Sequence, residues 1–218
     1  MSISGYTGSG QAWETGLKWL KTCVMKHGAL CPAIFTPAGP PKLPLRVIDI
    51  VARESQDVRL VETDGQVGHY ACLSHCWGDK QPLRTTLDPD TLSLYKKGIR
   101  WGSLPRTLQE AIIVARHFDF QFLWIDSLCI LQDDIQDWRV QSALMAEIYR
   151  NAVVTIAGSA SSGAYQGLFR TADTEHIDVP LQPKTGVEEK GKLRSRKALS
   201  QPPNYHYCSV VGCSKSDY

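Results

Sequence analysis

The segment FLWIDSLCILQDDIQDWRVQSALMAEIYRNAVVTIAG, residues 122–158, decides the fold class of this chain. Its beginning, 122–126, is a short aromatic and β-branched run that predicts a buried strand. Residues 137–151 carry apolar side chains at helical spacing, and 153–158 predicts a second buried strand. Strand, helix and strand in this order indicate a βαβ unit, whose strands are parallel and whose crossover is right-handed.

A second helix precedes this segment and continues the alternation. Residues 107–110, Thr-Leu-Gln-Glu, match a capping box, which marks the N-terminus of a helix. Leu108, Ile112 and Ala115 would lie on one face of that helix, and Phe118 extends this face. We therefore expect a helix between the strand at 122–126 and the strands before it.

Three further strands are predicted upstream of this helix. They cover residues 45–51, 58–62 and 66–74. Asp64-Gly65 favours a tight turn between the last two, so we expect an antiparallel hairpin there. Together the elements predict an α/β fold, with a mainly parallel sheet flanked by helices and, in addition, an N-terminal helix and the antiparallel hairpin.

The rest of the chain divides around this domain. Apolar residues from Trp13 to Val24 recur at spacings of 4, 3 and 4 residues, which predicts an amphipathic helix over residues 11–27. We expect residues 1–44 to be this helix with a Pro-rich arm, 45–171 the domain, and 172–218 a weakly ordered, basic, solvated tail. Within the domain, the polar stretch 78–102 is long enough for a functional lid or an insertion.

Composition excludes several classes of protein. The chain is 43% hydrophobic and 21% charged, which is typical of soluble globular proteins. Its net charge of +2 gives no support for a nucleic acid partner or an anionic membrane surface. The first ten residues lack the apolar core of a signal peptide, and no apolar run approaches the roughly 20 residues of a membrane helix. We expect a cytoplasmic protein.

Seven cysteines without an export signal disfavour a disulfide framework, because their number is odd. Cys23 and His27 have the i, i+4 spacing that suits metal ligation, and Cys31 follows four residues later. A fourth ligand is missing nearby, although Cys208 and Cys213 are candidates. Packed thiols at a helix terminus explain the spacing equally well, so we assign no metal.

Polar residues follow the predicted strands at their carboxyl ends, where open α/β sheets bind ligands. If the strands are parallel, these residues meet at one edge of the sheet. Asp126 is the candidate catalytic base, with Cys129 beside it, although Asp126 could equally cap the following turn. The candidate ligand-binding residues are Ser74, Trp77, Gly78 and Ser127.

Other ligand and nucleophile motifs have less support. Cys76 next to His75 suggests a nucleophilic thiol, but adjacent strand residues point to opposite faces, so we expect Cys76 to be a packed residue. Neither GxGxxG nor GxxxxGK[ST] occurs, which leaves standard dinucleotide and P-loop binding unsupported. Among the tryptophans, Trp77 is the one we expect to face a ligand.

Six segments resemble one known family in order and spacing: LRVIDI at 45–50, YACLSHCWG at 70–78, LPRTLQEAIIVARHF at 104–118, FLWIDSLCILQDDIQDW at 122–138, MAEIYRNAVVTIAG at 145–158 and GLFR at 167–170. This family is the fungal heterokaryon incompatibility (HET) domain, and the domain predicted at 45–171 is similar to it. The segment at 19–31 also looks like one that often precedes this domain.

The resemblance implies an effector of fungal self/non-self recognition and programmed cell death. Such an effector acts through self-association or by binding other incompatibility proteins. The family is similar in fold to TIR domains, which are flavodoxin-like sheets, and some TIR domains hydrolyse NAD. The alternative function is therefore a TIR-like NAD nucleosidase, with NAD as a substrate and no resident cofactor. A cysteine hydrolase around Cys76 or Cys129 is a third hypothesis.

One position departs from the family pattern. HET domains typically show D-W-x-x-E, whereas this chain has Asp137, Trp138 and, in place of the glutamate, Gln141. Gln141 is the third candidate catalytic residue, after Asp126 and Cys129. A carboxylate can stabilise an oxocarbenium charge, but an amide can only orient ribose hydroxyls. Glu147 lies about 1.7 turns further along the helix and is no substitute. The chain also stops at Tyr218, so we expect no separate sensor domain.

Overall fold

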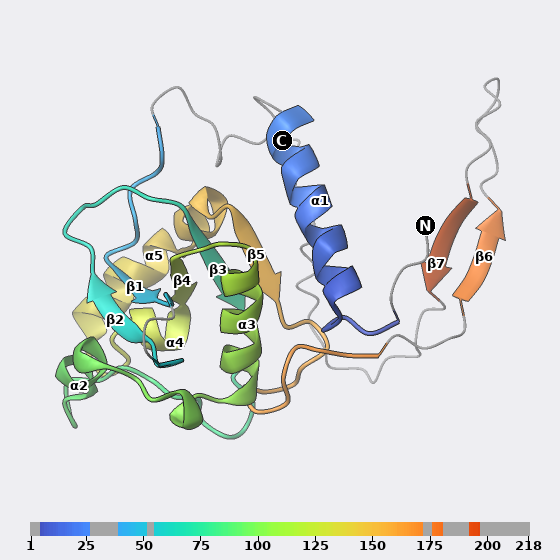
Figure 1. Cartoon of the computed structure of the whole chain (residues 1–218). Helices are drawn as coiled ribbons and strands as arrows, with labels where there is room; N and C mark the ends of the chain where they lie inside the picture. Colours follow the sequence, from blue (N-terminus) through green and yellow to red (C-terminus); the bar gives the residue numbers. More distant parts are fainter. Residues whose placement is uncertain (1–4, 27–38, 52–54, 172–175, 181–191, 197–218) are drawn as a thin grey trace.

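The computed structural model describes residues 5–26, 39–51, 55–171, 176–180 and 192–196 (Figure 1). Its centre is a five-stranded sheet with the order β2-β1-β4-β3-β5. β4, β3 and β5 are mutually parallel, while β1 is antiparallel to both β2 and β4. The strands are β1 (Arg46–Asp49), β2 (Arg59–Glu62), β3 (Tyr70–Ser74), β4 (Phe122–Ile125) and β5 (Val154–Ala157).

The predicted α/β class is confirmed, and the sheet is mixed rather than purely parallel. The helices are α1 (Gly10–Lys26), α2 (Thr91–Lys97), the 3₁₀ turn η2 (Trp101–Ser103), α3 (Arg106–His117), α4 (Asp126–Cys129) and α5 (Ile135–Asn151). Two further strands, β6 (His176–Pro180) and β7 (Lys192–Arg196), pair with each other as a separate antiparallel ribbon. No helix of the described residues is long and apolar enough to cross a membrane.

The long helices α3 and α5 cover opposite faces of the sheet (Figure 1). The chain passes from β3 through α3 to β4 on one side, then through α5 to β5 on the other side of β3. Right-handed crossovers in opposite directions place their helices on opposite faces. On the α5 face, the Tyr70 hydroxyl donates a hydrogen bond of 2.7 Å to the carbonyl of Ile148, and Trp124 packs edge-on against Tyr149.

The predicted hairpin between residues 58–62 and 66–74 is wrong, although its turn forms. Asp64 and Gly65 both have positive φ, and the Gln66 amide donates to the Thr63 carbonyl at 2.9 Å. After the turn, however, the chain pairs with the Pro-rich arm, where the Leu43 amide donates to the Gln66 carbonyl.

β3 then enters the middle of the sheet, between β4 and β5, while β2 pairs with β1. Four of the five residues of β3 are buried. A continuous apolar run of this kind suits a strand that is covered on both faces. The outer strand of a hairpin would leave one face exposed to solvent, so β3 is better accommodated in the middle of the sheet.

The stretch at 78–102 is a packed part of the domain and not a lid. It contains α2 and η2, and the side chains of Tyr95 and Ile99 are buried in the core. Its first half is tied to the segment after α4, because the Asp133 carboxylate accepts hydrogen bonds of 2.9 Å from the amides of Leu87 and Asp88. These backbone bonds hold the pKa of Asp133 below its usual range.

The Thr107–Glu110 motif is not a capping box. Pro105 is the N-cap of α3, and no side chain caps this helix end. The Thr107 hydroxyl instead accepts a hydrogen bond of 3.0 Å from the Gly167 amide, and the Glu110 carboxylate accepts 2.9 Å from the Phe169 amide. The two side chains therefore fasten the loop after β5 to α3.

Two predicted boundaries also differ. α5 begins at Ile135, because the Asp134 side chain caps it by accepting 2.9 Å from the Gln136 amide. Asp126 opens α4 instead of ending the strand before it. The strand predicted as buried at 153–158 is an edge strand, and every residue of β5 is only half-buried.

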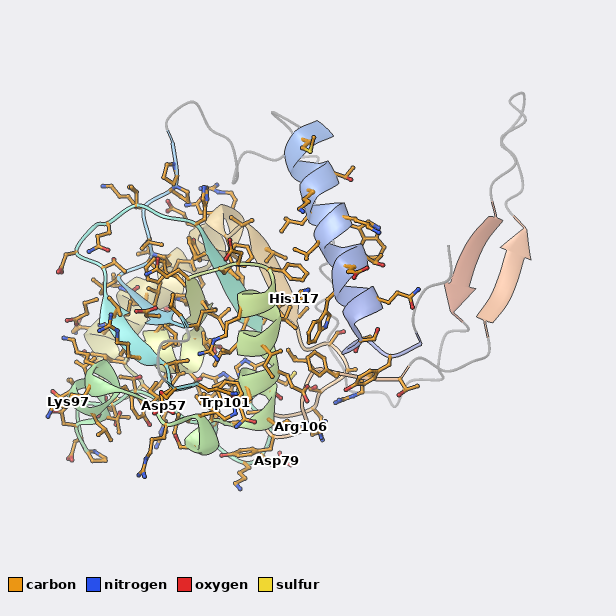
Figure 2. All side chains as sticks on the ribbon, viewed as in Figure 1. Asp57, Asp79, Lys97, Trp101, Arg106 and His117 are labelled. Carbon is orange, nitrogen blue, oxygen red and sulfur yellow. The ribbon has the colours of Figure 1, made fainter. Side chains whose placement is uncertain are left out.

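The N-terminal helix packs against the end of α3 and the loop after β5. Trp13 lies 4.9 Å from the ring of His117, which projects from α3 towards α1 (Figure 2), and 5.8 Å from the ring of Phe169. Just before α1, the Thr7 hydroxyl accepts a hydrogen bond of 2.8 Å from the Arg170 amide. The start of the described chain is therefore paired with the segment that follows the sheet.

Candidate functional site

The carboxyl ends of β3, β4 and β5 lie at one edge of the sheet, as the sequence predicts. The chain leaves β3 towards β4 on one side and later returns to β5 on the other side. The boundary between β3 and β5 is therefore the topological switch point of the parallel strands, and open α/β sheets bind ligands near such points. The residues that follow these strands form the candidate site.

Asp126 is the centre of this site. Its Oδ2 accepts a hydrogen bond of 3.1 Å from the Trp77 indole nitrogen, and its Oδ1 accepts one of 2.7 Å from the Ser127 amide. Burial raises the pKa of Asp126, while the nearby His75 and these hydrogen bonds oppose the rise. One oxygen of Asp126 thus serves the turn of α4 and the other binds the Trp77 indole, while its role as a base stays a prediction.

His75 shares this environment with Asp126. Both its ring nitrogens, Nδ1 and Nε2, are buried and have no hydrogen-bond partner in the described part of the chain. Burial lowers the pKa of His75, and the carboxylate of Asp126 opposes this shift. A half-buried imidazole beside a half-buried carboxylate, each with a shifted pKa, is typical of sites that bind or transfer protons.

The loops after β3 and β5 contact each other beside the cluster of His75, Trp77 and Asp126. The Gly158 amide donates to the Ser74 carbonyl at 2.8 Å, which continues the β3–β5 pairing beyond the strands. A side chain at Gly78 would meet the backbone of Gly163 at 2.8 Å, and the Ala164 amide donates to the Trp77 carbonyl. Ser74 and Gly78 therefore shape the edge through their backbone.

The two cysteines of the described residues near this edge, Cys76 and Cys129, differ in exposure. Cys129 is 1% exposed, its sulfur accepts a hydrogen bond from the Ile125 amide, and burial raises its pKa to about 12. Because the thiolate is the reactive form, the structure argues against Cys129 as a catalytic residue. Cys76 is exposed, in contrast to the packed position expected for it, while its neighbour His75 is half-buried.

Gln141 and Asp137 lie on α5, away from the contacts of the cluster. Gln141 is buried, and no hydrogen bond or ion pair of the described residues joins it to Asp126 or His75. Asp137 forms a buried ion pair with Arg46 of β1 and accepts 2.8 Å from the Leu131 amide. Asp137 is thus structural, which the motif alone does not reveal.

The predicted metal motif falls mainly outside the described residues. Cys23 is in α1, whereas His27, Cys31, Cys208 and Cys213 are not among the residues that the structure describes. Among those that it does describe, no group of His, Cys, Asp and Glu is arranged to hold a metal ion.

Sequence reasoning placed Trp77, Asp126 and Ser127 together correctly, and it passed over His75 as a partner of Asp126. The signal for His75 was available, because it lies between Ser74 and Trp77 and follows the same predicted strand. The same reasoning missed Glu110, whose contacts with the β5 loop join residues about 60 positions apart.

The fold and this edge define an α/β protein with polar side chains gathered at the carboxyl ends of parallel strands. A family model described as "Heterokaryon incompatibility protein (HET)" matches residues 70–207, which is more than half of the chain. The chain belongs to the heterokaryon incompatibility family. No curated protein and no solved structure matches it at a significant level.

Proposed function

We propose that this chain is an effector of fungal self/non-self recognition, which triggers cell death by cleaving a nucleotide such as NAD at the edge of β3 and β4. The observation that carries this proposal is the interaction of His75 with Asp126 at the carboxyl ends of the neighbouring strands β3 and β4. Membership of the HET family supports the incompatibility role.

The proposed reaction is hydrolysis of the bond between nicotinamide and ribose C1′. Cleavage of this bond leaves positive charge on the ribose, and a carboxylate beside the ring stabilises it. Asp126 supplies that carboxylate, held by the Trp77 indole and the Ser127 amide. Water adds to C1′, nicotinamide leaves as a neutral molecule, and the proton released by the water passes to Asp126 or His75 and then to solvent.

The test is incubation of the purified protein with NAD and chromatography for free nicotinamide. We expect the natural chain to release nicotinamide and Asp126→Asn to lower the rate about 100-fold, because the amide cannot stabilise the developing charge. Asp79→Asn is the matched control, since Asp79 is an exposed carboxylate two residues after Trp77 (Figure 2). We expect this control to cleave NAD at the natural rate.

The variant Gln141→Glu tests whether cleavage depends on Asp126 alone or also on the glutamate that HET domains typically have at position 141. Because no hydrogen bond of the described residues joins Gln141 to Asp126, we expect this variant to cleave NAD at a rate close to the natural one. Cleavage by Gln141→Glu alone would mean that the site needs an acid on α5. Release of nicotinamide by neither protein would contradict the nucleotide proposal.

A second candidate function, assembly with further copies, is favoured by β5. It is an edge strand of the described sheet, and exposed edges are templates for pairing with another chain. We expect the sedimentation coefficient to rise with protein concentration and Thr155→Lys in β5 to abolish the rise, with the exposed Gln136→Lys as control. A constant coefficient in the natural chain would exclude assembly through this edge.

A further inference from the structure

Glu110 is a buried carboxylate of α3 that binds the loop after β5. Its residue is 7% exposed. Oε2 accepts hydrogen bonds from the amides of Leu168 and Phe169, the second at 2.9 Å, and Oε1 accepts one of 2.7 Å from the Arg106 side chain. A buried charge costs free energy unless it is paired and hydrogen-bonded, so these three donors stabilise the carboxylate in its place.

The two oxygens of Glu110 have different partners. Both loop amides bind Oε2, whereas the ion pair with Arg106 uses Oε1. The Arg106 side chain is 60% exposed, so this ion pair contributes little to stability. The loop also passes close to the carboxylate, because a Cβ at Gly167, whose φ is +81°, would lie 2.7 Å from Oε2. The principal contact of Glu110 is therefore the loop and not Arg106.

Thr107, almost one turn earlier on α3, holds an earlier part of the same loop. Its residue is completely buried. Its amide donates a hydrogen bond of 3.0 Å to the Ala164 carbonyl, and its hydroxyl accepts one of 3.0 Å from the Gly167 amide. Thr107 and Glu110 together therefore attach residues 164–169 to the first half of α3.

From this loop the contacts continue to the candidate site. The Ala164 amide donates a hydrogen bond of 3.3 Å to the Trp77 carbonyl, and Gly163 lies against Gly78. The Trp77 indole in turn donates 3.1 Å to Asp126. Trp77 is thus held by the loop through its backbone and by Asp126 through its indole. Such a continuous chain of contacts can transmit a displacement of the loop to the indole.

We propose that Glu110 is a positioning residue of the candidate site: through the loop after β5, its carboxylate sets the place of the Trp77 indole against Asp126. Among the described residues, no hydrogen bond joins Glu110 to Asp126 directly, so the loop is the path of this effect. The inference rests on the proposed function in that Asp126 is the group being positioned, but its test does not require that NAD is cleaved.

The test follows the indole N–H signals of ¹⁵N-labelled protein by NMR, and Trp77→Phe identifies the signal of Trp77 among the six tryptophans. Glu110→Leu removes both oxygens. We expect it to shift the Trp77 signal and to speed hydrogen exchange of this indole about tenfold, because a hydrogen bond to a carboxylate is weakened. Glu110→Gln keeps an oxygen for the two loop amides, so we expect it to retain the signal and exchange rate of the natural chain.

Arg106→Gln is the matched control, because it breaks the ion pair at Oε1 and leaves the loop bonds at Oε2. We expect it to leave the Trp77 signal in place. Thr107→Val is a second test of the path, since it removes another bond to the loop, and it should also shift the Trp77 signal.

Urea unfolding of each variant shows the conditions under which it is folded, and the NMR spectra are recorded there. If Glu110→Leu and Thr107→Val lose stability but leave the Trp77 signal unmoved, the inference is overturned and Glu110 serves the fold alone. An equal shift in Arg106→Gln or in Glu110→Gln would also overturn it, because the bonds at Oε2 would then not be the cause.

The outcomes separate this inference from the proposed function. If Glu110→Leu shifts the Trp77 signal but the natural chain releases no nicotinamide, the positioning role stands and the cleavage proposal fails. If NAD is cleaved while folded Glu110→Leu keeps the natural kcat, KM and Trp77 signal, cleavage stands and the positioning role fails.

Discussion

Replacement of Arg46 by methionine is expected to lower the free energy of unfolding by about 3–5 kcal/mol. Arg46 is 4% exposed. Its guanidinium forms an ion pair with the Asp137 carboxylate and donates a hydrogen bond to the carbonyl of Cys129. Without it, the carboxylate of Asp137 stays in a largely buried place with the Leu131 amide as its remaining partner. Loss of one member of a buried ion pair costs more than the pair itself contributes, because a charge is left uncompensated.

Urea unfolding measures this effect, and the chain offers a matched control. Glu62→Gln breaks the ion pair with Lys96, whose side chains are 35% and 42% exposed, so its cost should stay below about 1 kcal/mol. The double variant Arg46→Met with Asp137→Leu should recover most of the loss. A cost for Arg46→Met no larger than that of Glu62→Gln would show that the buried pair does not anchor α5 to β1.

The second large effect is expected for Gly78→Ala, at about 2–4 kcal/mol. Gly78 has φ of +74°, where side chains are strained, and a Cβ would lie 2.8 Å from the Cα of Gly163 and 2.9 Å from the carbonyl oxygen of Ser162. The neighbours are backbone atoms, which cannot move aside as a flexible side chain does. The loops after β3 and β5 would therefore separate at the candidate site.

Gly65→Ala isolates the contribution of the backbone angle. Gly65 has φ of +79°, but no atom lies within 4 Å of its Cβ position, so its cost should be about 1–2 kcal/mol. The difference between the two variants in thermal or urea unfolding measures the packing of Gly78 on Gly163. Equal costs would mean that the two loops adjust without strain.

Much of the fold follows from local patterns. The apolar runs at 122–125 and 154–157, with an amphipathic helix between them, predict the β4–α5–β5 unit because burial and periodicity are local properties. Strand pairing is not local. Asp64-Gly65 specifies a turn, yet which strand β3 joins depends on the whole sheet, and the apolar run of β3 required a central position.

The candidate site could likewise be predicted only in part. Parallel strands bring their carboxyl ends together, so Trp77 and Asp126 meet as expected. Cys129 fails as a candidate because α4 turns its thiol into the core, a consequence of one short helical turn that no periodicity signals. Thr107 and Glu110 match a capping box in sequence, but the loop after β5 competes successfully for their side chains.

The pairing of Thr7 with Arg170 has a consequence for the time course of synthesis. These residues are 163 positions apart, so at about 5–20 residues per second Thr7 waits roughly 10–30 s for its partner to be made. Until Phe169 is made, Trp13 of the N-terminal helix lacks one of the two rings that it packs against. Trp13 is then open to chaperones, and α1, although it is among the first elements translated, completes its contacts only after β5 has been made.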